Sequence, residues 1–577
     1  MSIRYLNLFG ACDFEFGIST FHPPLTPPLK RGEIDSMFKR LKILNGESKT
    51  ITGAALFLGA ASLASRLLGV FRDRVLAGQF GAGDSLDIYY AAFRIPDFIF
   101  NLLILGALSA GFIPVFMELI FSSKENGHRE AWEMVNNLIN IMGVILIVVC
   151  GLFIFFSSFL VPIITPGFSA EKMQTTILMT QIMMLSPLFL GISNILGGVL
   201  QSFKRFFIYS LSPIFYNIGI IIGALFLVPR FGLYGLAIGV VLGALTHMAI
   251  QIPAVMQLGF RYKPVLDWGN KSVRKIVKLM VPRTLGLAVS QINLTAITII
   301  ASTLTAGSLS IFNLSSNLQY FPIGIIGVSF AIAAFPALGE CAASGNKDLM
   351  VKNFSHAVRQ ILFLIIPSSV LLLLLRAQIV RVILGAGAFN WEDTILTADA
   401  LAIFVLSLFA QALIPLLVRF FYALQDTKGP FLIGLVSVII NIILAVFLSK
   451  PYGIIGLVIS CTISNLINFC LLWIFLRIKF GSLDEGRILK SILKISVAAV
   501  FMAIVIQPMK YFLSDFVNMQ TFLGIFFQGL GAGLAGIVIF ATISLLLKSE
   551  EMLAIWQTIK YKLFKVKPAV ITEEGPK

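Results

Sequence analysis

Apolar runs of about 20 residues recur along this chain from Ile51 to Leu547, and they constrain its fold more than any other feature. Twenty residues of helix are about 30 Å long, which matches the hydrocarbon core of a bilayer. A membrane β-barrel would alternate apolar and polar residues, and these runs do not alternate. Only 12% of the 577 residues are charged, about half the share found in soluble domains. The sequence therefore predicts an all-α polytopic membrane protein.

The positions of the runs predict fourteen transmembrane helices. The expected spans are 51–77, 86–116, 134–161, 174–202, 206–228, 232–256, 275–304, 308–338, 354–384, 396–424, 430–448, 453–477, 487–510 and 521–547. Lys and Arg gather in alternate loops, such as 261–275 and 477–490. Because cytoplasmic loops retain Lys and Arg, we expect both termini to face the cytoplasm. This distribution accounts for the net charge of +16, so we expect no nucleic-acid partner.

Short matches between the first and second halves of the chain indicate an internal repeat. FGLYGLAI at 231–238 matches YGIIGLVI at 452–459, and RLLG from Arg66 matches RTLG from Arg283. Two copies of a six-span unit share one membrane orientation, so we expect two six-helix lobes related by a pseudo-twofold axis along the membrane normal. The expected domains are an N-terminal tail (1–50), two lobes (51–258 and 272–480), two additional C-terminal helices (487–547) and a cytoplasmic tail (548–577).

The N-terminal tail contains the proline-rich, polar stretch FHPPLTPPLKRGEIDS and has no apolar core of a signal peptide. It is interpreted either as disordered or as an extension upstream of the true start codon. The five cysteines and four histidines show no ligand-like spacing, so neither a metal site nor a disulfide framework is expected.

The stretch from Ser65 to Asp97 places charges inside otherwise apolar spans. Arg66 lies near the middle of the first span, and Asp73 follows two turns later on the same face. A charge at that depth costs about 2.5–3.5 kcal/mol on insertion scales. One interpretation is that Arg66 pairs internally, while Arg72 and Arg74 extend to the membrane interface. The other is a cationic cavity for an anionic head group, because the arginine fork binds phosphate through two parallel hydrogen bonds.

The repeat favours the cavity interpretation, because it sets Arg283 opposite Arg66. Asp87 begins the second span, where an acidic residue can also cap a helix. Pro96 interrupts that span and predicts a hinge, with Arg94 beside it. Two related bundles with a cleft between them are typical of alternating-access transporters. A membrane enzyme would be expected to carry a cluster of catalytic side chains, and none is evident, so we expect no enzymatic activity.

Short motifs recur along the chain: SRLLGVFRD (65–73), FGAG (80–83), AAFRIPD (91–97), GALSAGFIPVF (106–116), TPGF (165–168), SQINL (290–294), FPIGIIGV (321–328), GAGAF (385–389) and RFFYALQDTKGP (419–430). Together they resemble the MurJ/MviN family of bacterial lipid II flippases, within the multidrug/oligosaccharidyl-lipid/polysaccharide exporter superfamily. The resemblance extends from about Ile51 to Leu547. It implies a flippase that carries the undecaprenyl-linked peptidoglycan precursor lipid II across the bacterial plasma membrane.

The resemblance also implies site residues. Arg66, Arg72, Asp87 and Arg94 match family positions in a central substrate cavity. Two further family arginines are replaced here, by Phe100 and by Asn317, so the cavity would include Asn317, and Arg283 would supply part of the missing charge. These departures leave another lipid-linked glycan, or a drug, as an alternative cargo. A membrane scaffold for wall synthesis that does not transport is the second alternative.

The remaining expectations concern ligands and partners. The family implies a groove at the last two spans for the isoprenoid tail, although the small residues of GLGAGLAG (529–536) are equally compatible with helix packing. We expect no cofactor, and coupling to Na⁺, H⁺ or the membrane potential. The expected partners are membrane lipids and the lipid-linked precursor. A monomer is expected, in association with wall-synthesis proteins.

Overall fold

The computed structural model describes residues 51–105, 111–121, 127–554 and 556, except for the side chains of 51–62, 105, 281–283 and 285–286. The described residues belong to one compact unit, Glu47–Lys577. The expectations for the N-terminal tail and for most of the C-terminal tail lie outside them. Every regular element in the described part of the chain is helical, and no strand occurs there, which confirms the all-α prediction.

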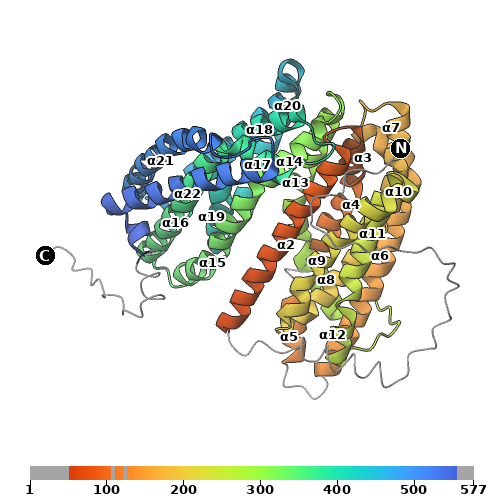
Figure 1. The fold of residues 1–577 in the computed structure, drawn as a ribbon. Coiled ribbons are helices and arrows are strands. Elements are labelled where there is room, and N and C mark those ends of the chain that lie inside the picture. The colour runs from red at the N-terminus through yellow and green to blue at the C-terminus, as the bar shows by residue number, and fades with distance from the viewer. Residues whose placement is uncertain (1–50, 106–110, 122–126, 555, 557–577) are drawn as a thin grey trace, which may run out of the picture. The chain divides into compact units, whose positions relative to one another are not determined.

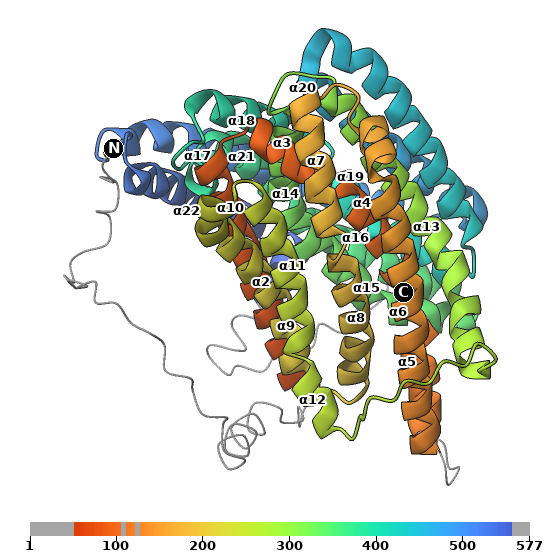
Figure 2. The same cartoon turned by 90° about the vertical axis from the view of Figure 1, so that its right-hand side faces the viewer.

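The first half of the chain forms a bundle of α-helices and π-helices. Its elements are α2 (Ile51–Phe80), α3 (Asp84–Ala92), α4 (Arg94–Ile99), the π-helix η1 (Phe100–Leu105), α5 (Ile113–Ile120), α6 (Gly127–Ile164), α7 (Ala170–Met183), α8 (Ser186–Ser202), α9 (Phe206–Ile222), the π-helix η3 (Gly223–Leu227), α10 (Val228–Phe231), α11 (Tyr234–Ala249) and α12 (Ile252–Gln257). Helix α2 lies beside α9 in both views of the ribbon (Figure 1, Figure 2).

The second half and the C-terminal pair follow in chain order. They contain α13 (Lys271–Ser302), α14 (Ser308–Pro322), the π-helix η4 (Ile323–Gly327), α15 (Val328–Ala343), α16 (Lys347–Leu374), α17 (Arg376–Ile383), α18 (Trp391–Val405), α19 (Leu408–Ala423), α20 (Lys428–Phe480), α21 (Glu485–Ser514) and α22 (Phe522–Leu546). The pair α21 and α22 packs on α16 and α17, on the side of the second half away from α6 (Figure 1).

Within the described ranges, nine helices are long and apolar enough to cross a membrane, or ten if the bent pair α18 and α19 is one span. The longest, α20, covers two expected spans in 53 residues. Its backbone leaves the helical region at Gly453, with φ 56° and ψ −134°, a conformation that glycine adopts without a Cβ penalty. The multi-pass membrane architecture is therefore present.

Three buried apolar clusters hold the helices together. One belongs to the first half and includes the start of α13, and a second joins the second half to α21 and α22. The third contains residues of both halves, at the helix ends opposite the basic loops. The two halves are thus packed together at the end away from the cytoplasm expected from the basic loops, and the start of α13 also packs on the first half at the opposite end.

Helix breaks fall where the sequence dictates them. Pro96 has no N–H to donate to the carbonyl of Ala92, and α3 ends there, so that α4 begins after a break at Phe93. Asn390 and Asp393 form a reciprocal capping box at the start of α18. The interruption expected at Pro96 is present, and its role as a hinge stays a prediction.

Candidate functional site

The centre of the charged region is Asp73 on α2, whose two carboxylate oxygens serve different partners. Arg72 donates to Oδ1 from Nη2 at 2.7 Å and from Nε at 3.0 Å. Asn317 of α14 donates to Oδ2 at 3.0 Å. Arg72 also donates to Oδ1 of Asn217 on α9, at 3.0 Å. Asp73 is only 7% exposed, so this charge is balanced inside the protein rather than in solvent.

Arg66 lies two turns before Asp73 and contacts the second half differently. Its partly buried guanidinium packs against Gly324 of η4, in the space that a Cβ at position 324 would occupy. On α2, Arg66 precedes Asp73 by the same number of residues by which Gly324 follows Asn317. The two contacts therefore join segments that run antiparallel. Among the described residues, Arg66 has no hydrogen bond and no ion pair, so its charge is available to an anion.

Arg94 at the start of α4 is a second cation without a close partner. Its Nε is buried and makes no hydrogen bond within the described chain. Asp97 is near enough to interact electrostatically with both Arg94 and Arg72, but it forms no ion pair with either in the described part. A buried guanidinium nitrogen that lacks an acceptor is costly, which favours a site that is completed by a ligand.

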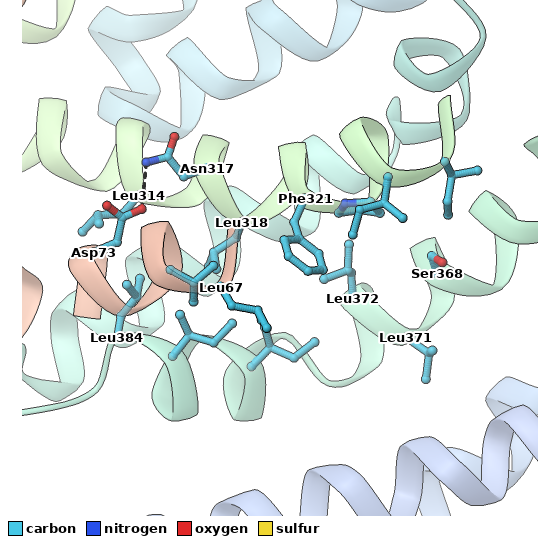
Figure 3. A pocket seen from close by; sticks show the side chains of 16 residues that line it. Leu67, Asp73, Leu314, Asn317, Leu318, Phe321, Ser368, Leu371, Leu372 and Leu384 are labelled. Atoms are coloured by element: carbon cyan, nitrogen blue, oxygen red, sulfur yellow. Dashed lines mark hydrogen bonds between the residues drawn. The ribbon is translucent and has the colours of Figure 1, made fainter. Parts of the chain in front are cut away.

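An apolar cavity of about 510 Å³ lies between α2, α14, η4, α16 and α17. Figure 3 shows its lining: Asp73 and Asn317 lie at one end, joined by their hydrogen bond, and Leu67, Phe321 and Leu372 continue the wall. The cavity thus has a polar end formed by the charged cluster and an apolar remainder. Arg66 and Arg72 do not line the cavity but are the chain neighbours of Leu67 and Asp73, which do. A polar end with cations beside it and an apolar remainder suit a molecule that has a polar head group on a hydrocarbon chain.

Asp87 does not line this cavity. Its carboxylate accepts hydrogen bonds from Gly307 N (2.8 Å), Ser310 N (2.8 Å) and Ser310 Oγ (2.7 Å), at the start of α14. Lys172 adds an ion pair at 3.2 Å. A carboxylate is stabilised at a helix N-terminus by the unpaired amides there. Asp87, which is 3% exposed, therefore joins the two halves, and its role in a substrate cavity stays a prediction.

Two of the glycine motifs meet beside this contact. Gly81 of FGAG and Gly387 of GAGAF both have positive φ, at 66° and 52°. The Ala388 amide donates to the Gly78 carbonyl at 2.7 Å. The Ala82 amide donates to Oδ2 of Asp393 at 3.2 Å. Side chains at these glycines would strike the opposite backbone, so the motifs serve a close approach of the two halves.

Arg74 makes contacts that the sequence did not predict, and its position at the membrane interface stays a prediction. Its guanidinium donates to the carbonyls of Val382 and Ile383, at the C-terminal end of α17. It also lies 4.9 Å from the ring centroid of Phe522 at the start of α22. A cation at a helix C-terminus meets the negative end of the helix dipole. Arg74 thus connects α2 to α17 of the second half and to α22 of the C-terminal pair.

The other candidates are distributed more widely. The side chain of Arg283 lies outside the described residues, although α13 passes through this position. Phe100 packs against the apolar cluster of the first half. The glycines of GLGAGLAG pack closely on neighbouring helices, because a Cβ at Gly536 would lie 2.6 Å from Cγ1 of Ile506. In the described part, no three His, Cys, Asp or Glu side chains are grouped as metal ligands.

Sequence reasoning missed two partners of the arginines. Asn217 lies within an apolar run, and nothing in the sequence indicated that it would be the partner of Arg72. Gly324 is one of the two glycines in FPIGIIGV, and no pattern distinguishes it from Gly327. Only the three-dimensional contact identifies it as the residue that accommodates Arg66.

Comparisons with known proteins agree with these features. Residues 76–527 match the family model described as lipid II flippase MurJ. A Vibrio cholerae relative named "Probable lipid II flippase MurJ" is 30% identical over 74% of this chain and 83% of its own length. A Haemophilus influenzae relative of the same name is 32% identical over 71% and 83%.

Solved structures extend the comparison to the fold. A structure of lipid II flippase MurJ in an inward closed conformation has a TM-score of 0.69 and 25% identity, and it covers 89% of this chain and 100% of its own. An inward-facing multidrug transporter of the MATE family has a TM-score of 0.63, covers 74% of this chain and 99% of its own, and at 14% identity supports the fold alone. The chain belongs to the MurJ family of lipid II flippases.

Proposed function

We propose that this protein carries lipid II from the inner to the outer leaflet of the bacterial plasma membrane, by exposing a site between its halves to each side in turn. The observation that carries this proposal is the guanidinium of Arg66, which has no partner in the described chain and lies beside an apolar cavity. A pyrophosphate linked to an isoprenoid chain has the two chemistries that this arrangement matches. No covalent step is involved, since only the accessibility of the site changes.

The arginines would act together on the pyrophosphate. Arg66 and Arg94 offer donors that the described chain leaves unused, and Arg72 offers charge that Asp73 already balances in part. Asn317 would orient Asp73 through their hydrogen bond and would remain neutral toward the ligand. In this proposal Arg283 adds charge from the second half.

The isoprenoid tail would leave the cavity along its apolar wall. Helix α17 lines the cavity and also packs against α22, where Gln378 donates to Gln528 at 3.0 Å. The outer faces of α21 and α22 expose large apolar side chains, among them Val500, Ile504, Leu534 and Val538. A groove along this helix pair would therefore keep the tail within the hydrocarbon of the bilayer.

Alternation would require the contacts between the halves to separate. Asp87 and the two glycine motifs join the halves at the end away from the basic loops, so the site is closed at that end. Moving to the outward state would break the Asp87 contacts with α14. The break before Pro96 offers a place at which the second span can bend.

Recurring backbone features support fourteen spans in two related lobes. Gly232 and Gly453, which the repeat sets against each other, have similar conformations, with φ 59° and 56°. The π-helices η1 and η4 occupy corresponding places, since each interrupts the second expected span of its half. Near Arg283, the hydroxyl of Thr284 donates to the carbonyl of Leu102 in η1 at 3.2 Å, much as Arg66 contacts η4.

Further parts of the proposal concern the setting of the protein. Both termini would lie in the cytoplasm, because the basic loops share that side. The protein would act as a monomer, with wall-synthesis proteins as associates. The driving force would be a gradient of Na⁺ or H⁺, or the membrane potential. Moving one elementary charge across the membrane changes the free energy by about 2.3 kcal/mol for each 100 mV of potential.

A second cargo is favoured by one observation. Phe100 and Asn317 occupy two positions at which the family has arginine, and Asn317 is engaged with Asp73. With less positive charge, the site would suit a lipid-linked glycan that has a different head group. The proposed binding of the phosphates and the hydrocarbon chain would be the same.

Reconstitution in liposomes tests the proposal. Purified protein should move fluorescent lipid II between leaflets, and Arg66→Ala should abolish this movement while the protein stays folded. Arg66→Lys should restore it only in part, because lysine lacks the bidentate fork. Full activity of Arg66→Ala would contradict the proposed role of this residue. Movement of another lipid-linked glycan in preference to lipid II would establish the second cargo instead.

A further inference from the structure

A second cavity, of about 570 Å³, lies wholly within the first half and is separate from the candidate transport site. Its apolar walls come from α6, α8, α11 and α12, and one end is formed by Phe260 and Tyr262 of the linker between the halves. Ile147 and Met256 on its walls are 60% and 57% exposed. In a membrane protein such exposed apolar side chains face hydrocarbon, so the cavity is a groove open to the bilayer.

The linker at the mouth of the groove is held by an unusual set of side chains. Asn136 of α6 donates to the Arg261 carbonyl at 3.0 Å and accepts from the Lys263 amide at 2.8 Å. Asn137 donates to the Asp267 carbonyl and accepts from the Asp267 amide, both at 2.7 Å. Each asparagine thus binds both polar groups of the linker backbone, as a neighbouring strand would.

Asn140, one turn further along α6, completes the attachment and also lines the groove. It donates to the carbonyls of Lys263 and Val265 at 2.9 and 2.8 Å, and it accepts from the Tyr262 hydroxyl at 2.9 Å. The extended linker is therefore fixed beside the groove. Apart from the Tyr262 hydroxyl, the linker uses only backbone groups for these hydrogen bonds. Its other side chains are therefore free to contact the bilayer.

The exposed side chains of the linker are cationic and aromatic. Arg261 and Lys263 are exposed next to the groove. Asp267 is the only acidic residue between positions 258 and 278, and its Oδ1 accepts from the Gly269 amide at 2.7 Å. Tyr262 and Trp268 are 63% and 54% exposed. Aromatic rings of this kind lie at the level of lipid head groups, and clustered cations attract anionic lipids of the cytoplasmic leaflet.

We propose that the groove and its cationic rim bind one anionic glycerophospholipid of the cytoplasmic leaflet. An acyl chain lies along the apolar walls between α6 and α11, and the phosphate lies at Arg261 and Lys263. The occupant is a bilayer phospholipid rather than the transported lipid, because the groove is lined, within the described chain, by the first half and the linker alone, and Arg66, Arg72 and Arg94 are not part of it.

Native mass spectrometry of the full-length protein tests this proposal, with phosphatidylglycerol as the probe. Gly143 lines the groove, and a Cβ there meets no atom within 4 Å, so Gly143→Leu fills the groove without disturbing the helix packing. Gly151 is on the same helix, is equally open and lies outside the groove, so Gly151→Leu is the matched control. We expect Gly143→Leu to lose one retained phosphatidylglycerol and Gly151→Leu to retain it. Equal retention by both variants would overturn the proposal.

A second arm tests the charge of the rim. Arg261→Gln combined with Lys263→Gln should weaken phosphatidylglycerol binding by tenfold or more. The same two-charge change at Arg487 and Lys490, which are exposed on another cytoplasmic segment, should leave it unchanged. Wild-type protein should retain phosphatidylcholine poorly in the same titration. Equal binding of phosphatidylcholine, or equal effects of the two double variants, would show that the groove takes any acyl chain, and would overturn the anionic site.

Discussion

The replacement of Gly324 by alanine tests how the position of Arg66 affects transport. An alanine Cβ would lie 2.9 Å from Cζ of Arg66, whereas ordinary contact begins at 3.4 Å. The guanidinium of Arg66 must therefore move away from the new Cβ. Nη1 must move farther than Cζ, because Nη1 is the atom nearest to that Cβ. The clashing atoms belong to the far end of a flexible side chain, so the backbone of η4 can stay in place.

The effects on stability and on transport should differ. Alanine in place of glycine within a helix stabilises it by about 0.5–1 kcal/mol, which offsets the cost of moving Arg66. A hydrogen bond to a charged group contributes about 1.5–3 kcal/mol, and each 1.4 kcal/mol corresponds to a factor of ten. If displacement removes one such bond to the phosphate, flipping should fall by about tenfold to a hundredfold while the melting temperature changes little.

The assay follows fluorescent lipid II in proteoliposomes, using a reductant that cannot cross the membrane to detect the outer leaflet. Gly327→Ala is the matched control, since its Cβ would lie 2.6 Å from the carbonyl oxygen and 2.7 Å from Cα of Ala412. Backbone atoms cannot move aside cheaply, so this variant should lose folded protein. Wild-type flipping by a folded Gly324→Ala protein would refute the reasoning.

Three further predictions follow from contacts outside the cavity. Asp87→Ala should shift the protein toward the outward-open state, seen as faster labelling of a cysteine placed in the first turn of α14; unchanged labelling would contradict this. Glu551→Ala removes the buried partner of Arg359 at 2.8 Å and leaves the exposed Glu550 at 2.7 Å, so the free energy of unfolding should fall by about 1.5–3 kcal/mol, measured by denaturation. The Gly429 amide and the Lys479 ammonium both donate hydrogen bonds to the carboxylate of Asp426, which lies in a loop, and they lower its pKa. The resulting stabilisation is present above about pH 4 and is lost as pH falls through the lowered pKa, so melting should become more pH-dependent there than in Asp426→Asn.

Much of the fold was predictable from the sequence because its causes are local. The apolar runs specify helices, Pro96 predicts the break before α4, and Gly453 marks the turn between two expected spans. The motifs FGAG and GAGAF contributed to the family resemblance, although nothing in them indicated that they would contact each other. The family assignment made from these motifs is confirmed, and the roles of the cavity residues stay predictions.

The sequence by itself determined that helices span the membrane and that charges lie within the first of them, because hydropathy and covalent order are properties of the chain. The tertiary structure decided what each charge does. Arg72 meets Asn217 across 145 positions, and Asp73 meets Asn317 across 244. Arg66, on the same helix, meets a glycine and, within the described chain, keeps its charge free. An electrostatic energy depends on distance in space and on local burial, and both are set only when the helices pack.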